Sequence, residues 1–435
     1  MPRPRRTAND RAKRAAESLT EFIQAAPSSF HAAELVADKL ELAGFTRLRE
    51  DDDWFLQRGG YVVVRDGAVA AWRISSGTVS DSPFAIVGSH TDSPGFRLKP
   101  IADHEADGWR QLAVEVYGGP LFNSWLDREL SIAGRVALRD GTTRLIHTEP
   151  IARIPQLAIH LDRGVNAEGL KLDPQRHLRP VLAPGDGPTA LNLIAEEALV
   201  SESEIVGWDL ALIDSQEPQI FGTPPMLAAP RLDNLLSVAA TMSAIEETVP
   251  DGVIPLMVAF DHEEVGSRTR SGAGGSFLED VIDRIRDSIG STPNSARRGL
   301  AASWCISSDV GHSVHPNYPE RHDDDVRPVA GSGPILKVNA NQQYTSDAPG
   351  AALWKGVCET AGVSTQTFVS NNTVPCGITI GPLIAERLGV RTVDVGVPIL
   401  SMHSARELCA ASDAVDLQKA LAVFFAGAWP ERPAH

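Results

Sequence analysis

The chain carries the tetrapeptide Asp-His-Glu-Glu at residues 261–264, directly after the apolar run of residues 254–260. Such a run predicts a buried strand of a parallel sheet. In open α/β sheets, functional groups collect beyond the carboxyl ends of the strands. Of two adjacent glutamates there, one can ligate a cation while the other transfers a proton. A solvated acidic turn is the alternative interpretation of the same residues.

Other acidic and imidazole side chains also follow predicted strands or precede a predicted helix. They are His90, Asp92, Asp233, Asp309 and His403. Histidine and carboxylate ligands without cysteine suit zinc, manganese or cobalt at a catalytic site. A pair of metal ions about 3.5–4 Å apart needs one shared carboxylate and terminal ligands for each ion. The residue types fit such a pair, so we expect two divalent ions per subunit, zinc first and cobalt or manganese as alternatives.

Each of these residues also has a purely structural explanation. His90 fits a hydrogen-bonded turn histidine, and Asp92 fits the cap of a turn. Asp233 precedes a predicted helix and fits an N-cap, while His403 fits a packed, partly buried imidazole. The metal-centre hypothesis accounts for all of them together.

The elements around these residues alternate between strands and helices. Helices are predicted within residues 9–44, in two parts broken at Ala26-Pro27-Ser28-Ser29, and strands at 61–65, 68–74 and 84–89. The alternation resumes after residue 233, with helices predicted at 235–248, 277–289, 348–361, 382–387 and 413–428 and strands at 254–260, 301–307, 335–338, 365–369 and 391–395. This order predicts an α/β fold with a mixed, mostly parallel sheet flanked by helices.

Residues 96–232 have a different texture, rich in short strand patterns, proline and glycine. Strands are predicted at 112–117, 130–139, 142–147 and 157–161, with a hairpin turn at Asp140-Gly141 and one helix near 190–199. We therefore expect an α/β domain made of residues 1–95 and 233–435, interrupted by a mostly β domain at 96–232.

Composition narrows the classes of function. The 435 residues carry a net charge of -16, which argues against nucleic acid as a partner. We expect no membrane span, because no apolar stretch approaches the required length. The basic start Arg3-Pro4-Arg5-Arg6 is not followed by an apolar segment, which predicts a cytoplasmic protein. The four cysteines are scattered and are predicted to be buried free thiols.

At the level of motifs, the sequence resembles the M18 metallopeptidases, the aspartyl aminopeptidase family. The resemblance follows the family's order of motifs and covers nearly the whole chain. The motifs are Gly88–Pro94 (Gly-Ser-His-Thr-Asp-Ser-Pro), Trp125–Arg128 (Trp-Leu-Asp-Arg), Leu157–Leu161 (Leu-Ala-Ile-His-Leu), Arg231–Asn234 (Arg-Leu-Asp-Asn), Phe260–Ser267 (Phe-Asp-His-Glu-Glu-Val-Gly-Ser), Lys337–Asn341 (Lys-Val-Asn-Ala-Asn), Pro375–Gly377 (Pro-Cys-Gly) and Met402–Glu407 (Met-His-Ser-Ala-Arg-Glu).

The resemblance implies a two-zinc centre with Asp233 as the bridging ligand. His90 and Asp309 would complete one ion, and Glu264 and His403 the other. It also implies that the inserted β domain serves assembly, in a homo-oligomer of the tetrahedral dodecamer type with interior active sites and peptide substrates.

Four further roles follow from the same resemblance. Glu263 would be the general base, and Asp92 would orient His90 through its second ring nitrogen. His160 would help to hold substrate and the developing oxyanion in a neighbouring subunit, the alternative being a surface histidine on a strand. Lys337 would contact an acidic first side chain of the substrate, the alternative being an exposed lysine on an edge strand.

Two segments depart from the family pattern. Residues 118–124 differ from its usual run of three glycines and a tryptophan, and Gln156 replaces a histidine. The departures concern the shape of the substrate pocket, so an aminopeptidase of broader specificity is one alternative. Another co-catalytic zinc hydrolase, a deacylase or carboxypeptidase, is a second. A catalytically silent oligomeric shell is the alternative from outside the enzymes.

Overall fold

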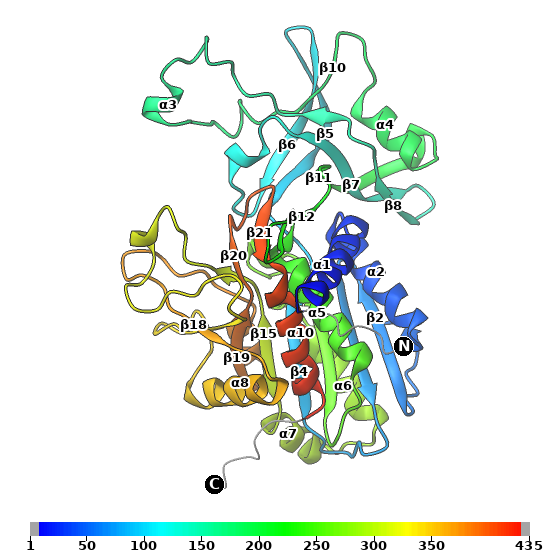
Figure 1. Ribbon diagram of the computed structural model, residues 1–435. Helices are drawn as coiled ribbons and strands as arrows, with labels where there is room; N and C mark the ends of the chain where they lie inside the picture. Colours follow the sequence, from blue (N-terminus) through cyan, green and yellow to red (C-terminus); the bar gives the residue numbers. More distant parts are fainter. Residues whose placement is uncertain (1–7, 428–435) are drawn as a thin grey trace, which may run out of the picture.

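The computed structural model describes residues 8–427, which form two stacked parts. Figure 1 shows a larger α/β part, which holds both ends of the described chain, below a smaller and mostly β part. Within the described residues, no helix is long and apolar enough to cross a membrane. The basic segment at residues 3–6 and the last residue of the helix predicted at 413–428 lie outside the described range.

A nine-stranded mixed sheet forms the centre of the larger part. Its four middle strands, β14, β4, β15 and β19, run parallel to one another. In spatial order the strands are β1 (Phe45–Leu48), β2 (Gly59–Arg65), β3 (Ala68–Ile74), β14 (Ile254–Phe260), β4 (Phe84–His90), β15 (Trp304–Ser308), β19 (Arg391–Gly396), β17 (Ile335–Lys337) and β18 (Gln366–Phe368). Every residue of β14 and β4 is buried, as expected for central strands covered on both faces.

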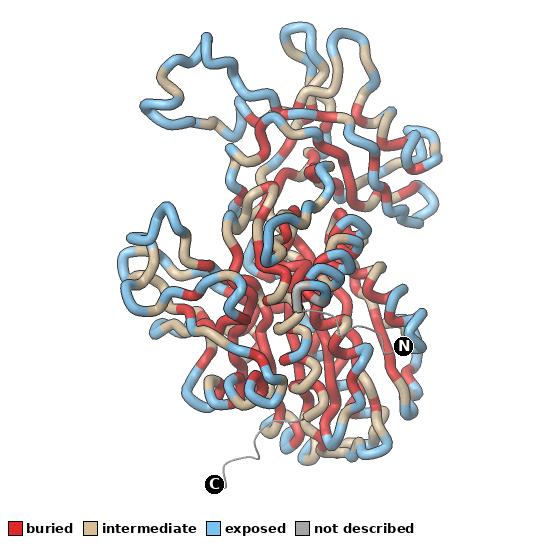
Figure 2. Tube along the Cα trace, viewed as in Figure 1, coloured by how far each residue is buried: buried red, intermediate tan, exposed pale blue. Residues whose placement is uncertain are grey.

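Helices cover both faces of this sheet. One face packs on α1 (Ala8–Ala25), α2 (Ser29–Leu42), α5 (Leu232–Glu247), α8 (Ala348–Ala361) and α10 (Ala411–Phe425). The other packs on α6 (Phe277–Ser288) and α9 (Gly381–Leu388). Two apolar cores result, one on each side, and Figure 2 shows the buried strands running between exposed helix surfaces. The predicted fold class is confirmed.

The smaller part is a closed β structure with its own apolar core. Pairing of β11 with β7 closes a ring of strands, with β8 added outside β7. The strands are β5 (Gly95–Ala106), β6 (Trp109–Tyr117), β7 (Glu129–Leu138), β8 (Thr143–His147), β9 (Ala152–Arg153), β10 (Val181–Pro184) and β11 (Ile205–Asp214). Short helices α3 (Val165–Glu168) and α4 (Ala190–Glu197) lie in its connections. We call residues 95–214 the β insert.

A third, five-stranded sheet lies where the two parts meet. It combines β12 (Gln219–Phe221) and β13 (Met226–Ala229) with β16 (Gly311–His312), β20 (Pro398–Leu400) and β21 (Glu407–Ala410). The chain returning from the β insert is therefore tied to late segments of the α/β part before it enters α5.

The prediction of a strand at residues 157–161 is wrong. These residues form an exposed loop that ends in a turn, and among residues 8–427 no strand pairs with them. Their alternating apolar pattern predicted burial of one face, but Leu157 and Leu161 are 58% and 75% exposed. The strand predicted at 301–307 begins only at residue 304, because α7 (Pro293–Ala301) occupies the preceding segment.

Candidate metal centre and active site

The turn after β14 presents both glutamates at the carboxyl edge of the sheet. His262 and Gly266 adopt left-handed backbone conformations, with φ of 63° and 94°, and a 3-10 turn covers Glu263–Val265 between them. In the neighbouring parallel strand β4, His90 is aligned with Phe260. This register puts the imidazole beside the glutamate turn.

His90 faces two carboxylates with one ring nitrogen. Its Nε2 lies 3.2 Å from Oδ1 of Asp233 and 3.5 Å from Oδ1 of Asp309. Asp233 is at the start of α5 and Asp309 directly follows β15, so three separate elements meet here. Ligand atoms of these three residues lie within 4.8 Å of one another.

His403 forms a second group on the other side of Asp233. Its Nε2 lies 3.5 Å from Oδ2 of Asp233 and 3.5 Å from Oε2 of Glu264. These atoms also lie within 4.8 Å of one another. The two oxygens of Asp233 thus face two different histidines, and its side chain is directed into the site instead of capping α5.

Main-chain carbonyls hold the other nitrogen of each histidine. Nδ1 of His403 lies 3.0 Å from the carbonyl oxygen of Gly119, and Nδ1 of His90 lies 3.0 Å from that of Asp92. The Asp92 carboxylate is farther from the same nitrogen, at 3.5 Å. With Nδ1 donating to a carbonyl, Nε2 of each ring is free to bind a metal ion.

Several carboxylates crowd into this buried space. Burial, with the charges of Asp309 and Asp233, raises the pKa of Glu263 to about 8. Burial and Asp233 also raise the pKa of Glu264 well above its usual value. Burial opposes a charge on His90, but Asp233 and Asp309 outweigh it and raise the pKa of His90 well above its usual range. Bound cations would relieve this concentration of negative charge.

The donor set fits divalent metal ions. Oδ1 of Asp233 and Oδ1 of Asp309 are buried and make no hydrogen bond within the described chain, although both face His90. Buried carboxylate oxygens without donors are costly unless a cation or water satisfies them. The cysteines are free, and none belongs to the clusters of potential ligands among residues 8–427.

Lys337 lies beside this centre, in the interior of the sheet. Its side chain is 2% exposed, and β17 is flanked by β19 and β18, so the alternative of an exposed edge-strand lysine is wrong. Its Nζ lies 3.4 Å from Oδ2 of Asp309 and 5.3 Å from the ring centroid of Tyr344.

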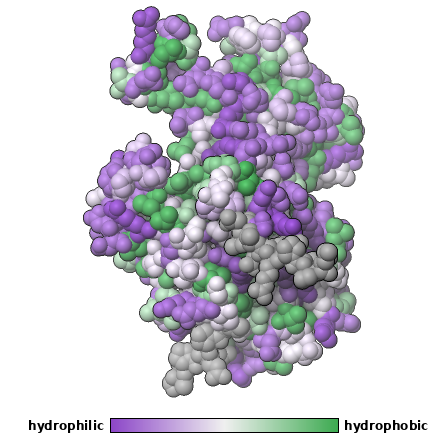
Figure 3. Space-filling view, viewed as in Figure 1, coloured by the Kyte–Doolittle hydropathy of each residue, from purple (hydrophilic) through white to green (hydrophobic). Residues whose placement is uncertain are grey.

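The structure does not bring His160 to the other predicted site residues of the same chain. It is exposed in the loop that follows β9, and it joins none of the ligand clusters within the described residues. Figure 1 shows that the long connection carrying α3, which begins with this loop, extends away from the strands of the β insert. The space-filling view shows a hollow between this projection and the α/β part below it (Figure 3).

Sequence analysis assigned no role to Glu407, a buried residue that binds the backbones of two candidate ligands. Its carboxylate accepts the N–H of Asp233 at 2.9 Å and the N–H of His403 at 2.8 Å. Burial and the charge of Asp233 raise the pKa of Glu407 to about 8. The available signals were its place at the end of the motif Met402–Glu407 and its position at the start of an apolar strand.

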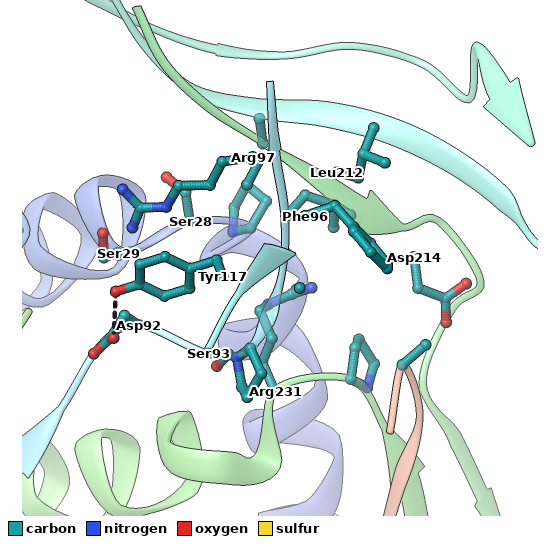
Figure 4. Close-up of a pocket in the computed structure, with 18 of the residues that line it drawn as sticks. Ser28, Ser29, Asp92, Ser93, Phe96, Arg97, Tyr117, Leu212, Asp214 and Arg231 are labelled. Atoms are coloured by element: carbon teal, nitrogen blue, oxygen red, sulfur yellow. Dashed lines mark hydrogen bonds between the residues drawn. The ribbon is translucent and has the colours of Figure 1, made fainter. Parts of the chain in front are cut away.

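A small cavity lies behind the candidate ligands, where the β insert meets α2 and α5. Asp92, Asp233 and Glu407 form part of its wall. Figure 4 shows Tyr117 pointing across this space to Asp92, with Arg231 on the side of the α/β part. The cavity thus lies between the candidate ligands and the core of the β insert.

The fold and the cluster of candidate ligands suit a metal-dependent hydrolase. The chain belongs to the M18 family: the family model described as Aminopeptidase I zinc metalloprotease (M18) matches residues 22–425. It is thus a member of a metallo-aminopeptidase family.

Relatives support the same assignment. The chain is 49% identical over 417 residues to a probable M18 family aminopeptidase 2 of Streptomyces coelicolor, covering 94% of this chain and 96% of the relative. Among solved structures, a complex of Ape4 and Nbr1 is similar with a TM-score of 0.92 and 33% identity, covering 96% of this chain and 86% of the other. The mApe1 dodecamer of S. cerevisiae has a TM-score of 0.82 and 28% identity, with coverages of 94% and 96%.

Proposed function

We propose that the protein is a two-metal aminopeptidase that releases N-terminal residues from peptides and prefers Asp or Glu there. The observation that carries the proposal is the position of Asp233, whose two oxygens face Nε2 of His90 and Nε2 of His403. Asp309 would complete the first ion and Glu264 the second. Zinc is the expected metal, with cobalt or manganese as alternatives.

When bound, divalent ions lower the pKa of water and polarise a peptide carbonyl. Glu263 belongs to a cluster with His90 and Glu264 but is not needed as a ligand in the proposed pair. We assign it as the general base, which takes a proton from the attacking water and passes it to the leaving amine. Burial raises the pKa of Glu263 to about 8, and bound cations would lower this pKa and favour the ionised carboxylate that a base requires.

Lys337 supports the preference for acidic residues. A buried ammonium beside the centre would pair with the carboxylate of a substrate Asp or Glu through a charge-assisted contact. Its contact with Asp309 favours a second possibility, namely that Lys337 balances the charge of this ligand and the specificity is broader. Hydrolysis rates of substrates that differ in their first side chain distinguish these two possibilities.

We further propose that the chain assembles into a homo-oligomer, the tetrahedral dodecamer, through the insert predicted at residues 96–232. Leu157, Ile159 and Leu161 are exposed around His160, and an apolar projection of this kind is typical of an interface. The dodecameric mApe1 neighbour supports the proposal of an oligomer. In the assembly, His160 would reach the active site of a neighbouring subunit. A cytoplasmic location remains our prediction from the sequence.

Kinetics with a panel of chromogenic substrates and defined metals tests the proposal. Free aminoacyl substrates should be hydrolysed, with Asp and Glu above Leu and Ala, and chelation should abolish turnover. Preferential hydrolysis of N-acyl or C-terminal substrates would instead indicate a deacylase or a carboxypeptidase. No turnover of any substrate with metal bound would indicate a catalytically silent shell.

A further inference from the structure

Asp92 lies at the centre of a buried hydrogen-bond network behind the metal centre. Its carboxylate accepts the N–H of Glu263 at 3.0 Å and the N–H of Glu264 at 3.1 Å. A third donor is the hydroxyl of Tyr117, 2.6 Å from Oδ2. Since the carbonyl of Asp92 also lies 3.0 Å from Nδ1 of His90, this one residue links the general base and two candidate ligands.

Tyr117 reaches this network from the β insert. It is the last residue of β6, paired with Gly95 of β5, and its side chain is buried. The guanidinium of Arg97 lies 3.8 Å from the centroid of its ring, a cation–π contact that holds the ring from the cavity side. Figure 4 shows the hydroxyl directed at Asp92 and away from the β insert.

The two residues after Tyr117 also contact the metal centre. Gly118 packs so closely that a Cβ there would lie 3.1 Å from Cβ of Glu264, and its φ of +66° favours glycine. The carbonyl oxygen of Gly119 lies 3.0 Å from Nδ1 of His403. One short segment of the β insert therefore contacts Glu264 and His403, the two terminal ligands proposed for the second ion, and it reaches His90 of the first ion through Asp92.

We propose that Tyr117 is a positioning residue for the metal centre, an inference that rests on the two-metal function proposed above. Its hydroxyl fixes the Asp92 carboxylate, which in turn fixes the backbone of Glu263 and Glu264. The main-chain carbonyl of the same residue holds the ring of His90. The hydroxyl is bound to Asp92, so Tyr117 acts through this neighbour. Without it, a buried carboxylate oxygen loses a donor, and the ligands that depend on Asp92 lose their fixed orientation.

Tyr117→Phe removes only the hydroxyl, and the readouts are metal affinity by competition with a chromogenic chelator, kcat, KM and Tm. Loss of such a supporting partner typically costs about 10–100-fold in metal affinity or activity. We expect zinc affinity and kcat at saturating zinc to fall by about tenfold or more, with KM changed less than about threefold.

Tyr61→Phe is the matched control. Tyr61 is also buried, and among residues 8–427 its hydroxyl bonds only to the backbone of Gln57, outside the site. This variant should lower Tm while leaving zinc affinity and kcat unchanged. If Tyr117→Phe behaves like Tyr61→Phe, Tyr117 is a packing residue and the inference is overturned.

A double-mutant comparison tests whether the hydroxyl acts through Asp92. In an Asp92→Ala background, adding Tyr117→Phe should change zinc affinity less than twofold, and a further fivefold loss would overturn the inference. This comparison stays informative even if Tyr117→Phe alone lowers the yield of purified protein. The two proteins compared, Asp92→Ala and the double variant, share the Asp92→Ala change. Failure of the wild-type protein to bind zinc, cobalt or manganese would overturn the two-metal function itself.

Discussion

At the scale of single residues, Asp233 is shared by both halves of the centre. One oxygen faces His90 and the other faces His403, while its main-chain N–H is held by Glu407. A terminal ligand such as Asp309 or Glu264 belongs to one half only. We therefore expect metal binding in both halves to depend on Asp233.

Asp233→Asn should reduce metal content more than replacement of any one terminal ligand, because an amide offers only one oxygen to the two ions. Elemental analysis of purified protein measures this directly. Asp413→Asn is a suitable control, since Asp413 is a buried carboxylate that binds the N–H groups of Gly331 and Gly333 away from the site. Two tightly held ions per chain in Asp233→Asn would disprove the bridging role.

Lys337→Met tests the preference for acidic substrates without adding a carboxylate beside Asp309. Loss of the ammonium should depress kcat/KM for N-terminal Asp and Glu by about tenfold or more relative to Leu and Ala, since a charge-assisted contact is worth about 1.5–3 kcal/mol. Metal content should be measured in parallel. An equal loss for all substrates would mean that Lys337 supports Asp309 and does not select substrate.

Among the helices and strands, the sequence was sufficient to predict elements whose buried residues form a continuous run or face. The apolar run at 254–260 is β14, and the helix predicted at 348–361 is α8. In the β insert the same approach missed β5 and β11, whose residues alternate irregularly between buried and exposed. It also wrongly predicted a strand at residues 157–161. An apolar pattern indicates burial, but it does not show whether the covering surface belongs to the same chain or to another.

The sequence predicts the site residues whose side chains can bind a metal ion or transfer a proton and that stand at the ends of predicted strands. The six residues His90, Asp233, Glu263, Glu264, Asp309 and His403 lie together in the clusters of potential ligands. Tyr117, Gly119 and Glu407 were not predicted, because their contributions depend on contacts between segments far apart in the chain. A tyrosine hydroxyl or a carbonyl has no distinctive spacing in a sequence.

The junction between α2 and the β insert should be sensitive to acid. Burial, reinforced by His147 of β8 and by Arg231, lowers the pKa of His31 to about 4. The unfolded chain therefore binds a proton at His31 that the folded chain excludes between about pH 6.5 and pH 4. Stability from this group is present above that range and is lost as the pH falls through it.

His31→Gln should reduce this acid sensitivity. Between pH 7 and pH 5 the wild-type protein should lose about 1 kcal/mol more stability than the variant, a value reduced for partial exposure of the ring. Thermal unfolding at several pH values measures the difference, with the exposed His177→Gln as the control. Identical pH profiles for wild-type and His31→Gln proteins would contradict the assignment.

In the whole molecule, we assign two roles to the β insert, one within its own chain and one toward a neighbouring subunit. Its Tyr117–Gly119 segment contacts Asp92 and His403 at the candidate metal centre of its own chain. Its loop around His160 projects outward, where Leu161 and its apolar neighbours remain exposed. The first role needs no partner, whereas the second requires a neighbouring subunit.

Co-expression of two inactive variants tests whether His160 acts across an interface. In particles that mix His160→Ala with Glu263→Gln chains, some active sites would combine a wild-type Glu263 with a wild-type His160 from the neighbour. Activity should rise well above that of either variant alone, because a donor for the developing oxyanion is worth a few kcal/mol. Mixed particles, verified by mass spectrometry, that stay as inactive as both parents would contradict the trans role.

Glu263→Gln, measured for both metal content and turnover, tests the two-metal mechanism most directly. If Glu263 is the general base and not a required ligand, the variant should keep its two metal ions and lose about a hundredfold to ten-thousandfold or more in kcat. A glutamine retains the size of the side chain, so the turn after β14 should persist. A variant that keeps its metal ions and more than a tenth of the wild-type rate would contradict the assignment.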